Sequence, residues 1–439
     1  MLSAHDAFSV RWRKRWKKWC AATMLGFAAI HASADHGFES SARAGDWPQI
    51  LGPHRNGVAD DEQLPERWPK SGPAILWRAK LGQGYAGPAV VGSRVVVFHR
   101  IGAKERLECF DLKSGQSTWA TDFACSYRGG IDPDLGPRCV PTIVDGAVVA
   151  YGVAGNLHCV SLADGKTRWS RDLFGDYQGD EGYFGAGSSP LVVESRVLVN
   201  VGGKSGAGLV ALDLRTGETL WKAGDEAASY AAPTFAKLGE KPAAIFVTRL
   251  NCVAVDPATG AVLFRFPFGK RGPTVNAATP LVVDDRLFLS ASYGIGAVSQ
   301  RWNGQAWVAA WANDDTMSSQ YATAVPFEKH LYGSHGREDV GETELRCVEL
   351  ATGKIAWSQS SSGVAHVLRA GDKLLVVNVD GTATLARANP VKFDALATAK
   401  IASQTTRAIP ALSQGRLLVR TNERGGPGEL LCVDVAAAE

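Results

Sequence analysis

Two pairs of carboxylates stand in polar segments where acidic side chains can bind a cation. Asp132 and Asp134 are two residues apart, and Asp180 directly precedes Glu181. Carboxylate oxygens are the ligands that Ca²⁺ prefers. Acidic residues in such segments are more often turn formers that face water. We therefore interpret both pairs as turn formers and predict no metal site.

Other motifs of catalysis are incomplete. His330 and His335 flank a hairpin-like segment, and their spacing is not that of zinc ligands. The chain has no Gly-x-Ser-x-Gly elbow and no phosphate-binding loop. The sequence thus gives no support to a zinc enzyme, a serine hydrolase of that type or a nucleotide-binding protein.

A nine-residue unit recurs along the chain, and we term it the turn–Trp motif. Its clearest copy is 213–221, in which Asp213 opens a turn, Gly217 adopts a positive φ, and Trp221 fills the wedge between neighbouring sheets. Successive aromatic residues are roughly 43 to 52 residues apart, which is the length of one propeller blade. The other copies are 111–119, 161–169, 256–264 and 349–357.

A second unit precedes most copies of the motif. It consists of a Pro, an apolar run, a polar turn and another apolar run, which predicts two buried strands joined by a hairpin. Together the two units predict an all-β fold built from four-stranded antiparallel blades. Copies of the second unit begin at Pro88, Pro141, Pro190 and Pro280.

The repeat count predicts an eight-bladed β-propeller, with seven blades as the alternative. Residues 75–81 form a strand with no blade before it, and the last unit, 402–435, supplies only three strands. The N-terminal strand should therefore complete the last blade and remove an open sheet edge. The predicted blades are 82–119, 120–169, 170–221, 222–264, 265–311, 312–357, 358–401, and 402–435 with 75–81.

The N-terminus has the features of a signal peptide. Residues 11–18 are strongly basic, 21–30 are apolar, and 32–34 have the small-x-small form of a cleavage site. An apolar run of that length is too short for a bilayer, which needs about 20 residues. We expect residues 1–34 to be removed and the protein to be exported to the periplasm or beyond, without a transmembrane segment.

Removal of that peptide changes the charge of the chain. The whole sequence carries +3, but its first 34 residues hold six Arg or Lys and one Asp, so the remainder is weakly acidic. No basic surface for nucleic acid is implied. We expect residues 35–74 to form a leader packed on a single propeller domain, 75–439.

The seven cysteines that follow the predicted signal peptide fall into two groups. One group shares a repeat-equivalent strand position in different blades, where the separation is too large for a disulfide, so we predict buried free thiols. Cys125 and Cys139 both lie in the long connection entering the second blade, and a disulfide between them is an open alternative. The first group comprises Cys109, Cys159, Cys252, Cys347 and Cys432.

The repeated Asp-x-x-Thr-Gly-x-x-x-Trp units, with the leader Trp47-Pro-x-x-x-Gly52-Pro, resemble the quinoprotein-type β-propeller family of pyrroloquinoline-quinone (PQQ) repeats. The resemblance covers about 75–435. The family includes PQQ-dependent alcohol dehydrogenases, a lipoprotein of outer-membrane β-barrel assembly and many exported propellers with no known activity. The fold alone therefore does not imply a function.

The resemblance implies what an enzyme of this family would contain. Its cofactor lies over the propeller axis, beside a Ca²⁺ held by Glu and Asn and near an Asp base. A disulfide between adjacent cysteines covers one face of the quinone, and a Trp stacks on the other. This sequence has no adjacent cysteine pair, which counts against a dehydrogenase.

Propellers usually bind ligands at an axial funnel. Residues directly before each innermost strand should ring the funnel, and their mixture of aromatic, Arg and amide side chains suits a polar or anionic small ligand. The alternative is that they only satisfy backbone groups and water. The predicted ring is Tyr85, Arg138, Ser188, Tyr230, Asn276, Tyr321, His366 and Arg407, and loops after the second strands add Arg249, Asn251, Tyr293, His335 and Asn378.

Three functions follow from these observations. We favour an exported, non-catalytic propeller that scaffolds protein or ligand contacts and holds no cofactor. One alternative is a periplasmic alcohol or sugar dehydrogenase that uses PQQ with Ca²⁺. The other is an outer-membrane protein assembly factor, against which the absence of a lipobox before Cys20 counts.

Overall fold

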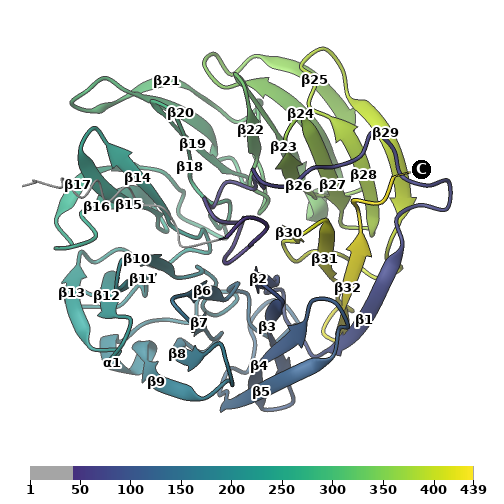
Figure 1. Ribbon diagram of the computed structural model, residues 1–439. Helices are drawn as coiled ribbons and strands as arrows, with labels where there is room; N and C mark the ends of the chain where they lie inside the picture. Colours follow the sequence, from purple (N-terminus) through teal and green to yellow (C-terminus); the bar gives the residue numbers. More distant parts are fainter. Residues whose placement is uncertain (1–42, 439) are drawn as a thin grey trace, which may run out of the picture. The chain divides into compact units, whose positions relative to one another are not determined.

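The computed structural model describes residues 43–438, which form eight four-stranded antiparallel sheets arranged as the blades of a propeller (Figure 1). The all-β prediction and the count of eight blades are confirmed. The predicted signal peptide, 1–34, lies outside the described residues. None of the helices within 43–438 is long and apolar enough to cross a membrane.

The blades follow one another along the chain, each running from an inner to an outer strand. Blades 1 to 4 are β2 (Ala89–Val91), β3 (Arg94–Ile101), β4 (Lys104–Asp111) and β5 (Ser117–Ala124); β6 (Thr142–Val144), β7 (Ala147–Tyr151), β8 (Asn156–Ser161) and β9 (Thr167–Asp172); β10 (Leu191–Val193), β11 (Arg196–Asn200), β12 (Leu209–Asp213) and β13 (Thr219–Ala223); β14 (Thr234–Leu238), β15 (Lys241–Val247), β16 (Asn251–Val255) and β17 (Val262–Pro267).

The second half of the ring repeats this arrangement, with two short helical turns, α1 (Leu173–Tyr177) and η1 (Glu338–Val340), in the loops. Blades 5 to 8 are β18 (Leu281–Val283), β19 (Arg286–Ala291), β20 (Gly296–Trp302) and β21 (Trp307–Asn313); β22 (Val325–Phe327), β23 (His330–Arg337), β24 (Glu342–Glu349) and β25 (Ile355–Ser360); β26 (Ala365–Ala370), β27 (Lys373–Asn378), β28 (Thr382–Arg387) and β29 (Asp394–Lys400); β30 (Ala411–Ser413), β31 (Arg416–Arg420), β32 (Gly428–Asp434) and β1 (Ile75–Leu81).

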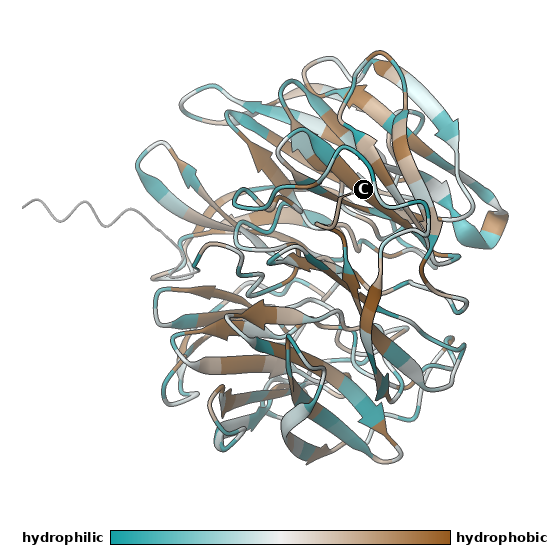
Figure 2. Cartoon of the chain, turned by 45° about the vertical axis from the view of Figure 1, so that its right-hand side comes forward, coloured by the Kyte–Doolittle hydropathy of each residue, from teal (hydrophilic) through white to brown (hydrophobic). Residues whose placement is uncertain are grey.

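Burial follows the position of a strand in its blade. Every residue of β7 is buried, whereas β5 alternates between exposed and half-buried residues. Inner strands therefore pack on both faces, and outer strands keep one face in water. Hydrophobic residues accordingly lie in the strands, and most connecting loops are hydrophilic (Figure 2).

The turn–Trp motif holds neighbouring blades together. Trp169 donates from Nε1 to the carbonyl of Leu214 in the next blade (2.9 Å). Its ring lies directly against Gly217, where φ is +74° and an added Cβ would come within 2.7 Å of the ring. The Gly is thus required both by its backbone conformation and by the Trp. The other such pairs are Trp77 with Gly115, Trp119 with Gly165, Trp221 with Gly260, and Trp311 with Gly353.

Blades 5 and 7, whose motifs are degraded, keep the contact with different residues. Phe264 of blade 4 meets Trp307 of blade 5 edge-on, with ring centroids 6.0 Å apart. Trp357 of blade 6 donates to the carbonyl of Asn389 (2.7 Å) and packs on Phe393. The wedge between blades is therefore filled even where the motif is lost.

The ring closes through its N-terminal strand. β1 pairs antiparallel with β32, and Trp77 stands opposite Cys432. The predicted closure is confirmed, and the two strands come from opposite ends of the described chain.

The cysteines within 43–438 are all buried free thiols, including Cys125 and Cys139. Four cysteines of the repeat-equivalent group stand opposite a Trp of the neighbouring strand. Cys252 is two residues out of this register and stands opposite Phe266. Its position is taken by Ala254, opposite Phe264, so one member of the predicted set was wrongly aligned.

Residues 43–62 cross the centre of the ring (Figure 1). Trp47 pairs with Val90 of β2, and Val58 forms a bridge with Arg369 of β26. Arg55 is buried and donates to the carbonyls of Ser189, Pro190 and Pro233, directly before β10 and β14. This leader segment thus joins the inner strands of separate blades.

Candidate functional site: the axial funnel

The four strands of a blade alternate in direction. The turn after the second strand and the connection that follows the fourth strand therefore lie on the same face of the propeller. We term this the connection face. Seven of the eight predicted ring residues lie on it directly before an innermost strand, whereas His366 is the second residue of β26 itself. The repeat therefore predicts where these residues lie, but it does not predict that they bind a ligand.

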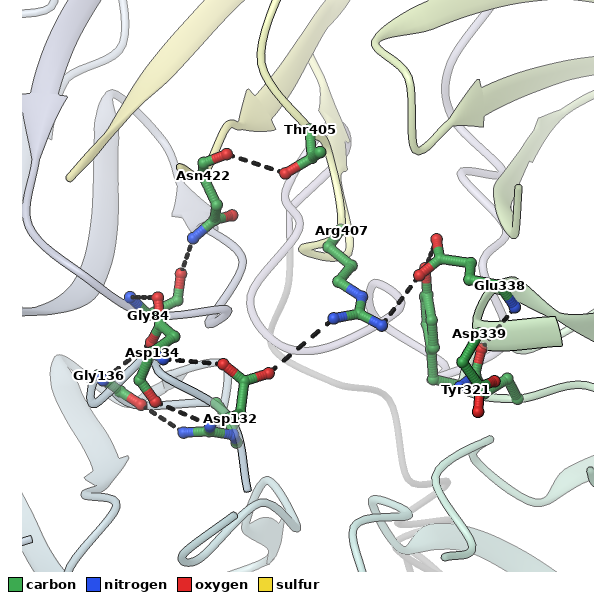
Figure 3. Close-up of polar contacts among 12 residues, drawn as sticks. Gly84, Asp132, Asp134, Gly136, Tyr321, Glu338, Asp339, Thr405, Arg407 and Asn422 are labelled. Atoms are coloured by element: carbon green, nitrogen blue, oxygen red, sulfur yellow. Dashed lines mark hydrogen bonds and ion pairs between the residues drawn. The ribbon is translucent and has the colours of Figure 1, made fainter. Parts of the chain in front are cut away.

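Arg407 lies at the centre of the funnel, between two carboxylates (Figure 3). Its guanidinium forms an ion pair with Glu338 (2.9 Å) and lies 4.0 Å from Asp132. It also lies over the rings of Tyr85 and Tyr321, 5.7 and 5.4 Å from their centroids. Arg407 is therefore neutralised by Asp132 of the connection before blade 2 and by Glu338 of the β23–β24 turn.

Tyr321 shares Glu338 with Arg407. The Tyr321 hydroxyl donates to the Glu338 carboxylate (2.6 Å). Burial, followed by the negative charge of Glu338, raises the pKa of Tyr321 well above its usual value. The phenol consequently stays protonated and serves as a hydrogen-bond donor.

Arg138 differs from Arg407 because it has no acidic partner. Its guanidinium lies 5.6 Å from the ring centroid of Tyr85 and 5.7 Å from that of Phe184. It donates to the carbonyls of Gly136 (2.8 Å) and Asp134 (3.0 Å). The ion pairs found among residues 43–438 do not include it. A half-buried cation is thus held in place by carbonyls and aromatic rings alone.

Three of the four candidate carboxylates shape loops. Asp134 is fully buried and accepts from the backbone N–H groups of Gly84 (3.0 Å) and Gly136 (2.9 Å). Asp132 accepts from the N–H of Asp134 (2.8 Å). Asp180 likewise accepts from the N–H of Gly182. These contacts agree with their interpretation as turn formers.

Four ring residues are hydrogen-bonded to backbone groups of neighbouring segments. Ser188 donates to the carbonyl of Ala231 (2.9 Å), and Asn276 donates to that of Thr248 (2.8 Å). The Tyr230 hydroxyl accepts from the N–H of Phe184 (3.0 Å). His366 Nε2 lies 2.9 Å from the carbonyl of Arg407, and burial lowers the pKa of His366 to about 4. These four support the connections, as the alternative interpretation of the ring predicts.

The residues predicted in the loops after the second strands fall into two classes: some are hydrogen-bonded within the loops, and others line a cleft. Arg249 donates to the carbonyls of Lys270 (2.9 Å) and Gly272 (2.6 Å) and so fixes that loop. Asn251 and Asn378 bond to Glu226 and Ser361. Tyr293 and His335 line a separate cleft beside the funnel.

Two residues of the funnel mouth were not foreseen from the sequence. Glu338 belongs to η1, in the turn between β23 and β24, and Phe184 lies in the connection before β10. A long hairpin in blade 6, with Glu338-Asp339 at its tip, is the only local signal that could have indicated the first. Nothing in the local sequence distinguishes the second.

The residues of this funnel do not fit PQQ. A flat quinone with carboxylate groups would need bare aromatic faces and unpaired cations, but guanidiniums lie over Tyr85, Tyr321 and Phe184. Arg407 is already paired with Glu338. Within 43–438 no three His, Cys, Asp or Glu side chains are grouped so that they could hold a metal ion.

Comparison with known proteins places the chain among propellers of several functions. An outer membrane protein assembly factor BamB from Alkalilimnicola ehrlichii is 30% identical over 141 residues, which cover 32% of each chain. The BamB of Burkholderia pseudomallei is 25% identical over 273 residues, covering 52% of this chain and 68% of that protein. The match thus spans about a third of the first relative and about two thirds of the second.

Solved structures share the fold at low sequence identity. BamB from Moraxella catarrhalis superposes with a TM-score of 0.60 at 16% identity, covering 82% of this chain and 97% of that one. The quinohemoprotein alcohol dehydrogenase from Comamonas testosteroni gives 0.68 at 15% identity, covering 91% and 82%.

The sequence pattern of one family matches residues 103–359, more than half of the chain. The matched segment runs from blade 1 to the outer strand of blade 6 and includes most of the turn–Trp motifs. This chain therefore belongs to the family of PQQ-repeat β-propellers described as outer membrane protein assembly factor BamB.

Proposed function

We propose that the protein is an exported, non-catalytic propeller whose connection face binds a polar or anionic partner at the axial funnel. The observation that carries the proposal is the contrast between two arginines that share the ring of Tyr85. Arg407 is neutralised by Glu338, whereas Arg138 has no ion-pair partner among residues 43–438. A half-buried unpaired guanidinium favours an incoming oxyanion.

The rest of the funnel supports binding over catalysis. Tyr321 and Glu338 are hydrogen-bonded to each other, and Asp134 is saturated by backbone N–H groups. A general acid or base must instead be free to exchange a proton with a substrate. The hydrogen bonds of these groups fix the shape of the funnel and leave the groups without a free position for proton exchange.

A titration with inorganic phosphate and with acetate tests the anion site. Arg138→Gln should weaken binding by about tenfold or more, because one charge-assisted contact is lost. Arg337→Gln is the matched control, since Arg337 also lies over a tyrosine ring on this face but is paired with Asp339. Equal affinities for the native protein and Arg138→Gln would rule out the site.

A reconstitution with PQQ and Ca²⁺ tests the non-catalytic role. We expect neither stoichiometric binding by calorimetry nor dye-linked oxidation of alcohols or sugars. A known PQQ dehydrogenase, treated in parallel, shows that the conditions are adequate. Turnover by this protein would overturn the proposal and make the funnel an active site.

Export is tested by cell fractionation and N-terminal sequencing. The protein should be found outside the cytoplasm with a mature N-terminus near Asp35. An intact Met1 in the cytoplasmic fraction would contradict export.

Outer-membrane protein assembly is the second candidate, and the family match supports it. On this proposal the connection face scaffolds a protein of an assembly complex. Deletion of the gene from its own host should then lower the amounts of folded outer-membrane proteins. Unchanged amounts would leave the small-ligand function as the better account.

A further inference from the structure

A cleft of about 1000 Å³ opens on the connection face, beside the funnel. It is formed by the loop before blade 5, the β19–β20 turn, the connection to blade 6 and the β23–β24 hairpin. Gln320 stands between the two sites: it donates to the Tyr293 hydroxyl (3.3 Å) and accepts from the N–H of Glu338 (3.0 Å). Val340 thus lines the cleft, while Glu338 belongs to the funnel.

The charges that line the cleft balance. Four are positive and four negative, so there is no net charge to attract an ion. Several are also unpaired: Lys270 and Arg271 on one side, and Asp314, Asp315 and Glu342 on the other, take part in none of the ion pairs of residues 43–438. The charged lining residues are Lys270, Arg271, Arg337, Arg346, Asp314, Asp315, Glu342 and Glu344.

The loop that carries the two unpaired cations is fixed by hydrogen bonds. Arg249 bonds to the Thr274 hydroxyl (2.8 Å) as well as to two carbonyls of the loop that carries Lys270 and Arg271. The Tyr183 hydroxyl donates to the carbonyl of Gly272 from a different connection (3.3 Å). Charged donors and acceptors that form no ion pairs with each other therefore line one cleft.

Tyr293 shows backbone strain at this cleft. Its φ is +68°, a left-handed conformation that is costly for a bulky residue and natural for Gly. The ring is fixed by the guanidinium of Arg337, 4.2 Å from its centroid, and by the bond from Gln320. Strained backbone is common at binding sites, so an aromatic residue at such a position indicates that its ring contacts a ligand.

His335 supplies a neutral donor. Its Nδ1 accepts from the N–H of Ser318 (3.0 Å), so the hydrogen of the neutral ring lies on Nε2. Burial, and then the charge of Arg346, lower the pKa of His335. The ring thus presents an uncharged N–H group among the charged ones.

We infer that this cleft binds a neutral, hydroxyl-rich ligand, an oligosaccharide chain of a few units. Each sugar hydroxyl can accept a hydrogen bond from Lys270, Arg271 or His335 and donate one to a carboxylate. A cleft with separate donors and acceptors and no net charge is therefore suited to a neutral sugar. The C–H face of a sugar ring packs against a fixed aromatic or apolar surface, here Val340, Pro273 and the face of the Tyr293 ring that Arg337 does not cover. The inference goes beyond the proposed function and does not depend on the anion site.

The test is calorimetric titration of the full mature chain with maltotriose, cellotriose, mannotriose and N-acetylchitotriose at millimolar concentration. At least one should bind, and its affinity should change little with salt, because the ligand is neutral. Trigalacturonate and the chitosan trimer serve as the anionic and cationic comparisons. Absence of binding by all four neutral sugars, or tighter binding of a charged trimer, would overturn the inference.

Tyr293→Gly separates binding from folding. The variant should raise the melting temperature by relieving the positive φ, while weakening sugar binding by about tenfold or more. Glu328→Gly is the matched control: Glu328 has φ +50° in the β22–β23 turn, away from the cleft. That control should be stabilised and bind normally. Unchanged sugar affinity in Tyr293→Gly would contradict the assignment, and phosphate affinity through Arg138 should be the same in all three proteins.

Discussion

The glycine of the turn–Trp motif is kept in all five copies of the motif for two separable reasons. Gly217 needs a positive φ, and the ring of Trp169 leaves no room for a Cβ. Gly206 has a similar φ, +79°, but open space around it. The two positions allow the cost of the backbone conformation and the cost of the contact to be measured apart.

Gly217→Ala should lower the free energy of unfolding by about 3 kcal/mol, from a positive-φ penalty of about 1 kcal/mol plus overpacking against Trp169. Gly206→Ala should lose only about 1 kcal/mol. Denaturant unfolding of both variants measures the difference. Equal losses would mean that the Trp contact adapts without cost.

His366 makes stability depend on pH. Its pKa is lowered by burial to about 4, below the value in the unfolded chain. Between that value and about pH 6.5 the unfolded state binds more protons, so this residue lowers the free energy of unfolding as the pH falls, on the order of 1 kcal/mol per pH unit. His366→Gln, which keeps a donor for the carbonyl of Arg407, should flatten the curve between pH 6.5 and 4. Parallel curves for the two proteins would contradict the burial of a neutral ring.

Among the segments, the leader acts as a tie across the inner strands. Arg55 is its anchor, because it satisfies three carbonyls of two blades and also bonds to Gln49 (2.8 Å). Burial without an acidic partner lowers the pKa of Arg55 to about 9. The side chain therefore stabilises the fold through hydrogen bonds to the backbone.

Arg55→Met should cost about 3 kcal/mol, since buried carbonyls are left without donors. Arg215→Met, at an exposed turn, should change stability by less than about 0.5 kcal/mol. Chemical unfolding followed by Trp fluorescence is suitable for both. A neutral Arg55→Met would show that water replaces the guanidinium.

The elements of the fold could be predicted from the sequence, whereas the side-chain contacts of the funnel could not. The turn–Trp motif and the paired apolar runs are local, so blade number, hairpins and the orphan strand could be predicted. The funnel is different, because Arg407 meets Glu338 of the β23–β24 turn and Asp132 of the connection before blade 2, which are far apart in the chain. Side-chain partners across a ring depend on the paths of long irregular connections, which carry no periodicity. The misalignment of Cys252 was local: it precedes the aromatic residue of its motif, Phe264, by 12 residues, whereas Cys109 precedes Trp119 by 10.

The molecule as a whole depends on one pair of strands for its closure. A chain that begins at residue 82 lacks β1 and leaves the edge of β32 unpaired. It should self-associate, because an open edge pairs with other chains. A chain that begins at residue 75 lacks the leader but keeps β1, and it should remain monomeric. Light scattering after size-exclusion chromatography distinguishes them; self-association of both would assign the effect to the leader.

The same pairing gives the two ends of the polypeptide different histories. β1 leaves the ribosome before any blade exists, and its partner β32 is made almost last. β1 therefore stays unpaired until synthesis is nearly finished. A nascent chain that ends early lacks β32, so its β1 has no strand to pair with. Completion of the ring therefore works as a length check: only a polypeptide translated to its final blade can hide its first strand, and prematurely ended products remain recognisable to proteases.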